Sequence, residues 1–201
     1  ETFVICCGYK GEQIIQFFEK YKLSKNEYLL PKNIKKKIIF LKTGINTGTE
    51  GRLVKTKKFI RNNENFFVCY TDALSNINFK KIYFQHKKNN KILTMTVTRP
   101  KERYGIAVIK SNHLISFNEN KSKQKNYKYW INAGFFVAQY KIFRYLKIKK
   151  NYFEKKPMDK LIKRKQVKVY KHLEEWTSVD TYKDLLNLKK AWKTNPFWKN
   201  W

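Results

Sequence analysis

The sequence has little of what usually makes loops, cross-links and metal sites. Its 201 residues include 7 glycines, 4 prolines and 3 cysteines. Cys6 and Cys7 are neighbours in an apolar run and Cys69 is distant from both, so the Cys/His spacing of a zinc site is missing. No apolar run approaches the roughly 20 residues of a membrane-spanning helix, and no leader-like segment stands at the start. We therefore expect a cytoplasmic protein that does not contact a membrane.

Acidic residues are also scarce, because 15 Asp and Glu face 45 Lys and Arg, for a formal net charge of +30. A charge of this size is typical of proteins that bind nucleic acid or anionic surfaces. The lysines are spread along the whole chain, however, and Asn and Ile, whose codons are also A/T-rich, are abundant. We favour compositional drift and expect no specific nucleic-acid partner, with a basic nucleic-acid-binding protein as the alternative.

The apolar content is high enough for a folded core despite the charge, since 42% of the residues are hydrophobic and 16% are aromatic. Short apolar runs predict strands at residues 2–7, 37–41, 65–70, 92–98, 105–109, 114–117, 130–138 and 167–170. Segments with helical spacing predict helices at residues 11–21, 51–61, 79–89, 141–147, 157–163 and 181–194. We expect a loop at residues 175–180. The alternation indicates an α/β fold with a mostly parallel sheet, in a single domain over residues 1–201.

Two aspartates stand where an α/β sheet places its ligands. Asp72 follows an apolar predicted strand, and Asp180 stands directly before the last predicted helix. Carboxylates beside phosphates suit a magnesium ion. The alternative for each is a helix N-cap; position alone supports both readings of Asp72 equally and favours the cap for Asp180. If both aspartates bind metal, they would converge on one cation.

Two further segments have the composition of a binding site. Residues 43–53 combine glycines, hydroxyl groups and Arg52 just before a predicted helix, which suits an anion or the edge of a base. In the apolar run 130–138, Asn132 stands close to Gly134. The Asn132 amide could bind a sugar hydroxyl, and a β-bulge is the alternative explanation.

Together these segments resemble the glucose-1-phosphate cytidylyltransferases of the sugar nucleotidyltransferase superfamily. The motifs with the highest specificity are Cys-Cys-Gly-Tyr-Lys-Gly at residues 6–11 and Gly-Phe-Phe-Val at residues 134–137. The resemblance extends over residues 3–11, 43–44, 49–53, 70–72, 103–105, 132–137, 180–181, 192–193 and 198. It implies a Rossmann-like, GT-A-like nucleotidyltransferase fold, a homo-oligomer, and the conversion of CTP and glucose 1-phosphate into CDP-glucose and pyrophosphate for deoxysugars of surface polysaccharide such as O-antigen.

The resemblance also implies a role for individual residues. Asp72 and Asp180 would hold Mg²⁺, and with Arg52 they would form the catalytic set. The nucleotide would contact Thr47, Arg52 and Thr71. The hexose would contact Glu119, Asn132 and Gly134.

The sequence departs from the family pattern at several places. The Gly-rich, Arg-bearing loop of the family and the strand before it would precede Glu1, so the sequence reads as an excerpt. Lys156 stands before Pro157 where the family has glutamate, and the Glu-Lys-Pro sugar motif is altered after Glu119. We therefore expect the chain as given to be an impaired enzyme, or alternatively a remnant that keeps sugar-phosphate binding.

Overall fold

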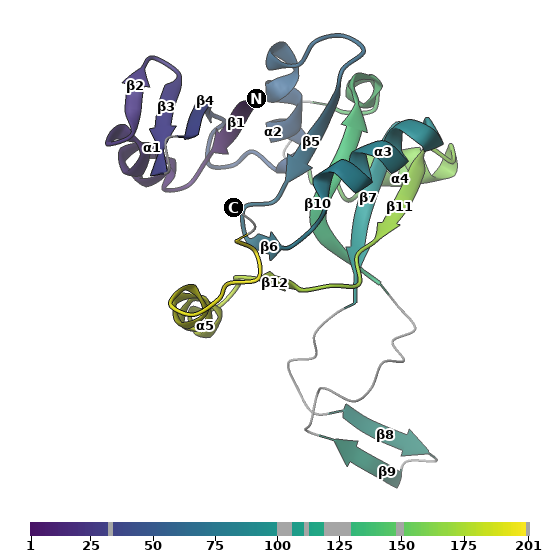
Figure 1. Ribbon diagram of the computed structural model, residues 1–201. Coiled ribbons are helices and arrows are strands. Elements are labelled where there is room, and N and C mark those ends of the chain that lie inside the picture. The colour runs from purple at the N-terminus through teal and green to yellow at the C-terminus, as the bar shows by residue number, and fades with distance from the viewer. Residues whose placement is uncertain (32–33, 100–105, 111–112, 119–129, 148–150, 200–201) are drawn as a thin grey trace. The chain divides into compact units, whose positions relative to one another are not determined.

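The computed structural model describes residues 1–31, 34–99, 106–110, 113–118, 130–147 and 151–199. The chain divides into two compact units (Figure 1). Unit 1 comprises Glu1–Phe66 and Ala138–Val167, and unit 2 comprises Phe67–Val137 and Lys168–Trp201. The single domain over residues 1–201 stays a prediction. In the described part of the chain, no helix combines the length and apolar character needed to cross a membrane.

Unit 1 contains a four-stranded sheet with the strand order β1-β4-β3-β2. Its strands are β1 (Thr2–Cys7), β2 (Lys22–Ser24), β3 (Glu27–Leu30) and β4 (Ile34–Lys42). β1 runs parallel to β4, as predicted, whereas β2, β3 and β4 pair antiparallel. β1 is the edge strand of this order, and its Phe3 side chain is 47% exposed.

The helix α1 (Gly11–Glu19) packs on this sheet through aromatic rings. The ring centroid of Phe18 lies 6.2 Å from that of Tyr28 on β3 and 5.5 Å from that of Phe40 on β4. Aromatic pairs in such tilted and edge-on arrangements stabilise beyond the area that they bury. The remaining helices of unit 1 are α2 (Thr49–Thr56), η2 (Lys57–Phe59), η3 (Tyr140–Arg144) and α4 (Lys156–Lys163).

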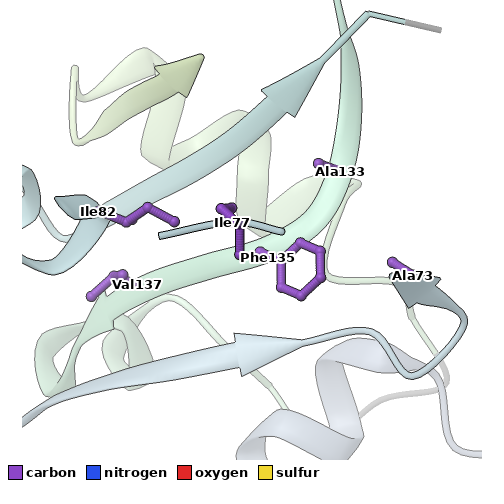
Figure 2. Packing of buried hydrophobic residues seen from close by; sticks show 6 residues of the cluster. All are labelled: Ala73, Ile77, Ile82, Ala133, Phe135 and Val137. Carbon is purple, nitrogen blue, oxygen red and sulfur yellow. The ribbon is translucent and has the colours of Figure 1, made fainter. Parts of the chain in front are cut away.

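Unit 2 is organised around the sheet β11-β7-β10-β5. Its strands are β5 (Asn65–Cys69), β7 (Leu93–Thr98), β10 (Ile131–Gln139) and β11 (Val167–Lys171). One or two terminal residues of β5, β10 and β11 are assigned to unit 1. The helix α3 (Phe79–Asn89) begins at the N-cap Asn78, whose side chain accepts the Lys81 N–H at 2.9 Å. Figure 2 shows how Ile82 of α3 joins Phe135 and Val137 of β10 in a buried cluster. The helix therefore covers the sheet through its apolar face.

Short elements complete unit 2. β6 (Ala73–Ser75) pairs antiparallel with β12 (Trp176–Ser178), and β8 (Ile106–Lys110) pairs antiparallel with β9 (His113–Asn118). The last helix, α5 (Tyr182–Trp192), begins with a capping box in which Thr181 and Asp184 satisfy each other's backbone N–H groups.

The predicted α/β class is confirmed, and one local prediction was wrong. Residues 175–180, predicted as a loop, contain β12, because a three-residue strand depends on its partner rather than on its own pattern. The helix predicted at residues 141–147 is the shorter 3₁₀ helix η3, which ends at Arg144.

We expect the stability of unit 2 to depend on pH through His86. This side chain is fully buried on α3, its Nδ1 lies 2.8 Å from Thr94 Oγ1, and burial lowers its pKa below the ordinary 6.5. The unfolded chain therefore binds a proton near pH 6.5 that the folded chain does not. The free energy of unfolding should fall below that pH by up to about 1.4 kcal/mol per pH unit, until the folded-state His86 also titrates.

Urea unfolding at pH 7.5 and pH 5.5 measures this dependence. H86Q should reduce the pH dependence of the free energy of unfolding. The matched control H113Q, at an exposed histidine, should keep the wild-type pH dependence. An equal pH dependence in H86Q and the wild type would show that another group is responsible.

Candidate functional site

The pairing of β6 with β12 brings the two predicted metal ligands to neighbouring positions in unit 2. The register aligns Ser178 with Ala73, and one residue further on the Val179 N–H donates to the Asp72 carbonyl at 2.9 Å. Asp180 is therefore the next residue after the partner of Asp72. Both aspartate side chains are exposed.

Neither aspartate is a helix N-cap, so the capping alternative was wrong for both. Asp72 leads into β6, and the cap of α3 is Asn78. The cap of α5 is Thr181. The Asp180 carboxylate is instead oriented by Ser178, whose hydroxyl donates to Oδ2 at 2.7 Å.

Gly134 allows β10 to approach the segment that carries Thr71 and Asp72. Gly134 has φ = +80°, and a Cβ added there would lie 3.2 Å from the Cβ atoms of Tyr70 and Ala73. The Tyr70 N–H donates to the Gly134 carbonyl at 2.8 Å. A side chain at this position would be strained by its backbone conformation and crowded by its neighbours.

The Asn132 side chain stabilises this conformation, because its Oδ1 accepts the Gly134 N–H at 2.9 Å. The Trp176 indole N–H donates to the Ala133 carbonyl at 2.8 Å, which ties β12 to the same segment of β10. Unit 2 thus gathers five predicted site residues, namely Thr71, Asp72, Asn132, Gly134 and Asp180. Their contacts with metal, nucleotide and hexose stay predictions.

The two aspartates suit a magnesium ion. Magnesium is usually held by one or two carboxylates, with water and substrate phosphates completing its coordination. Among the residues that the structure describes, no group of three or more His, Cys, Asp and Glu side chains could hold a metal. These two carboxylates alone could hold magnesium only with water and substrate oxygens completing its coordination.

The Thr43–Arg52 segment of unit 1 forms a second part of the predicted site. Arg52 on α2 donates from Nε to the Thr47 carbonyl at 2.9 Å, and from Nη1 to the Cys6 carbonyl at 3.2 Å and to Thr43 Oγ1 at 2.9 Å. A Cβ added at Gly8 would lie within 3 Å of the guanidinium, so any side chain at this position requires Arg52 to shift. Arg52 therefore joins the end of β1 to the loop before α2, and its Nη2 faces Gly8.

Thr43 is the buried centre of this loop, and sequence analysis included it in the resemblance without assigning it a role. It is 1% exposed, its hydroxyl donates to the Cys7 carbonyl at 2.8 Å, and its carbonyl accepts from Thr47 Oγ1 at 2.6 Å and from Lys55 Nζ at 2.7 Å. The Thr47 hydroxyl is thus directed back into the loop. Burial raises the pKa of the adjacent Cys6 thiol to about 11, which keeps it neutral.

The start of α2 is also held by the segment that precedes α4. Thr49 donates to Glu154 Oε2 at 2.9 Å and accepts the Phe153 N–H at 2.8 Å. A Cβ added at Gly48 would overlap the Asn151 carbonyl oxygen, so the backbone of Asn151 lies close to this glycine. Glu154 was missed by sequence reasoning, since it lies 105 residues from Thr49.

Glu119, the remaining predicted sugar ligand, lies outside the described residues, as do residues 103–105 of the resemblance.

A family model described as "Nucleotidyl transferase" matches residues 3–195. The chain belongs to the nucleotidyl transferase family. It is 33% identical to a probable glucose-1-phosphate cytidylyltransferase of Bacillus subtilis, over 99% of this chain and 81% of that protein. It is 28% identical to the glucose-1-phosphate cytidylyltransferase of Salmonella typhimurium, over 100% of this chain and 82% of that protein. The predicted resemblance to sugar nucleotidyltransferases of this kind is confirmed.

Solved structures of this nucleotidyl transferase fold agree with that assignment. The crystal structure of HddC from Yersinia pseudotuberculosis has a TM-score of 0.63 and 20% identity, and covers 95% of this chain and 78% of that chain. A putative glucose-1-phosphate thymidylyltransferase from Bacillus anthracis has a TM-score of 0.61 and 16% identity, and covers 95% of this chain and 76% of that chain. At these identities the similarity establishes the fold.

We expect G8A to destabilise unit 1 by displacing Arg52. The new methyl group would overlap the guanidinium, so hydrogen bonds to the Cys6 and Thr47 carbonyls must weaken. The expected loss is about 1–3 kcal/mol in the free energy of unfolding, measured by urea denaturation.

A double-mutant cycle with R52K tests this cause. Lysine removes the rigid fork, so G8A should cost much less in the R52K background than in the wild type. Additive effects would mean that Gly8 is required for a reason unrelated to Arg52.

Proposed function

We propose that this nucleotidyl transferase makes CDP-glucose and pyrophosphate from CTP and glucose 1-phosphate with Mg²⁺ as cofactor. Support comes from the two relatives described as glucose-1-phosphate cytidylyltransferases, which align with nearly the whole chain. The single structural observation that carries the proposal is the Val179–Asp72 hydrogen bond, which makes Asp180 a neighbour of Asp72. We further propose a cytoplasmic homo-oligomer whose product serves deoxysugar synthesis for surface polysaccharide such as O-antigen.

In this reaction a phosphate oxygen of glucose 1-phosphate attacks the α-phosphorus of CTP, and pyrophosphate leaves. No protein nucleophile is needed, since positioning and electrostatics carry such transfers. The Asp72 and Asp180 carboxylates would hold the magnesium ion, which when bound offsets charge on the phosphates. Ser178 would keep the Asp180 carboxylate in one orientation through its 2.7 Å hydrogen bond.

The other predicted residues would position the substrates. Thr47, Arg52 and Thr71 would contact the nucleotide, Arg52 through the Nη2 group that faces Gly8. Asn132 and Gly134 would face the hexose, with Glu119 as a further sugar contact. Hydrogen bonds already hold the side chains of Thr47, Arg52 and Asn132 in place. These side chains would therefore lose little conformational entropy when a substrate binds.

Binding of CDP-glucose should therefore depend on Mg²⁺ through both aspartates. By isothermal titration, Mg²⁺ should tighten CDP-glucose binding at least about tenfold, because a metal that clamps phosphates contributes several kcal/mol. D72N and D180N should each remove this dependence, whereas D159N, an exposed acidic position on α4, should keep it. Mg²⁺-dependent binding that survives in D72N would contradict the assignment, and tighter binding of dTDP-glucose would contradict the choice of base.

We also expect residues 1–201 by themselves to turn over slowly. The family's Gly-rich, Arg-bearing loop is not among these residues, and even one preorganised donor is worth about 10²–10³ in rate. A pyrophosphate-release assay should compare residues 1–201 with a polypeptide that includes the upstream coding sequence. Equal rates in the two would place the triphosphate contacts within residues 1–201.

A further inference from the structure

His172 is a buried histidine of unit 2 to which sequence analysis assigned no role. It follows directly after β11 and is 4% exposed. Its backbone N–H donates to the Val97 carbonyl on β7 at 2.9 Å. A polar side chain that is buried to this extent needs hydrogen-bond partners, so the contacts of its ring indicate what it does.

The His172 ring joins two segments of the chain through one nitrogen. Its Nε2 lies 2.9 Å from Ser75 Oγ on β6 and 3.1 Å from the Glu175 carbonyl oxygen, directly before β12. A carbonyl oxygen only accepts, so the hydrogen is assigned to Nε2. The Ser75 hydroxyl donates to the same Glu175 carbonyl at 3.1 Å, which leaves its oxygen able to accept from His172. One arrangement of hydrogens therefore satisfies all three groups.

Asn76 holds the same turn at a second point. Its backbone N–H donates to the Glu175 carbonyl at 3.4 Å, and its Nδ2 donates to Glu174 Oε2 at 2.8 Å. Ser75 is also the register partner of Trp176, the first residue of β12. The turn between β11 and β12 is thus fixed against the end of β6 before β12 begins.

These contacts connect the two segments that carry the proposed metal ligands. Ser75 stands three residues after Asp72, and Glu175 stands five residues before Asp180. The His172 ring contacts one residue on each side, so a single buried side chain spans both segments. The far end of β12 is fixed separately, by the 2.9 Å backbone hydrogen bond that reaches the Asp72 carbonyl.

We propose that His172 is a positioning residue for the Asp72 and Asp180 carboxylates. It acts through Ser75 and Glu175, which it keeps at a fixed separation. Magnesium demands near-ideal octahedral geometry at about 2.0–2.1 Å, so a small drift between the two segments weakens metal binding. This role rests on the proposed Mg²⁺ site, whose own failure the experiments below distinguish.

The substitutions H172M and H172Q isolate the N–H donor. Methionine and glutamine are similar in length and shape, but only glutamine can supply an N–H near the position of Nε2. In H172M, the Mg²⁺ concentration that half-saturates residues 1–201 in the presence of CDP-glucose should rise at least about tenfold, as for other groups that orient metal ligands. H172Q should restore most of this affinity.

Two controls separate positioning from a general loss of structure. CDP-glucose binding in EDTA should stay at the wild-type level in H172M, which a loss of folding would not allow. H113M makes the same change at an exposed histidine of β9, and should require Mg²⁺ like the wild type.

Hydrogen exchange at the Val179 amide measures the position of β12 without any ligand. This N–H donates to the Asp72 carbonyl, so its exchange should become about tenfold faster in H172M and stay unchanged in H172Q and H113M. If the wild type shows no Mg²⁺-dependent binding of CDP-glucose, the proposed function fails. The exchange rates then still decide whether His172 fixes the two segments.

S75A tests the route through β6. It removes the acceptor on β6 and leaves the His172 ring in place, so Mg²⁺ affinity should fall as in H172M. The loss in H172M/S75A should be smaller than the sum of the two single losses, since both changes remove the same contact. Thermal melting establishes that each variant is folded, and S75A replaces H172M in every comparison if H172M is not.

Three results would overturn the proposal. The first is a wild-type Mg²⁺ requirement together with wild-type Val179 exchange in H172M. The second is an H172Q protein as impaired as H172M, which would mean that the shape of the ring is required rather than its N–H. The third is additive losses in H172M/S75A, which would mean that His172 does not act through Ser75.

Discussion

The register between β6 and β12 is the constraint on which the arrangement of unit 2 depends. Because side chains alternate along a strand, a slip of one residue would turn every side chain of β12 to the other face and change which residue lies opposite Asp72. With only three residues in each strand, the ladder is too short to fix its own register. The Trp176 indole bond to the Ala133 carbonyl supplies that constraint from outside, because it fixes β12 against β10.

In unit 1, polar side chains rather than strand pairing hold the loop before α2 in place. The loop before α2 is held by Arg52 and Lys55, which donate to its carbonyl and hydroxyl oxygens, and by the contacts of Thr49 with Glu154 and Phe153. Charge-assisted hydrogen bonds to backbone oxygens are stronger than neutral ones. Arg52, which we expect to bind nucleotide, thus also stabilises the loop before α2. Substitutions at Arg52 will therefore affect both nucleotide binding and the structure of this loop.

The sequence was sufficient where an element carries its own pattern. β1 and α3 were predicted with their observed bounds, because one is a continuous apolar run and the other has helical spacing between clear ends. β2, β3, β6 and β12 are short strands whose pattern is too brief to recognise, and each exists because a neighbour pairs with it. The buried state of Glu50 and the role of Glu154 could not be predicted, since both depend on contacts about a hundred residues away along the chain. Asp72, Asp180 and Gly134 were predicted as site residues from motif resemblance, which carries long-range information that periodicity lacks.

Within residues 1–201, β1 lies at the edge of its sheet, and this position gives the large net charge of this polypeptide a physical role. An edge strand offers unpaired backbone groups to any other strand, including the same edge of another copy. With a formal charge of +30, two copies repel each other before their edges can meet. That repulsion reaches only about 10 Å at 0.1 M salt and about 3 Å at 1 M. Ionic strength therefore controls self-association through this edge. At low ionic strength, charge repulsion keeps the β1 edges of two copies apart. Concentrated salt screens this repulsion while leaving the apolar core intact, so that the edges can meet.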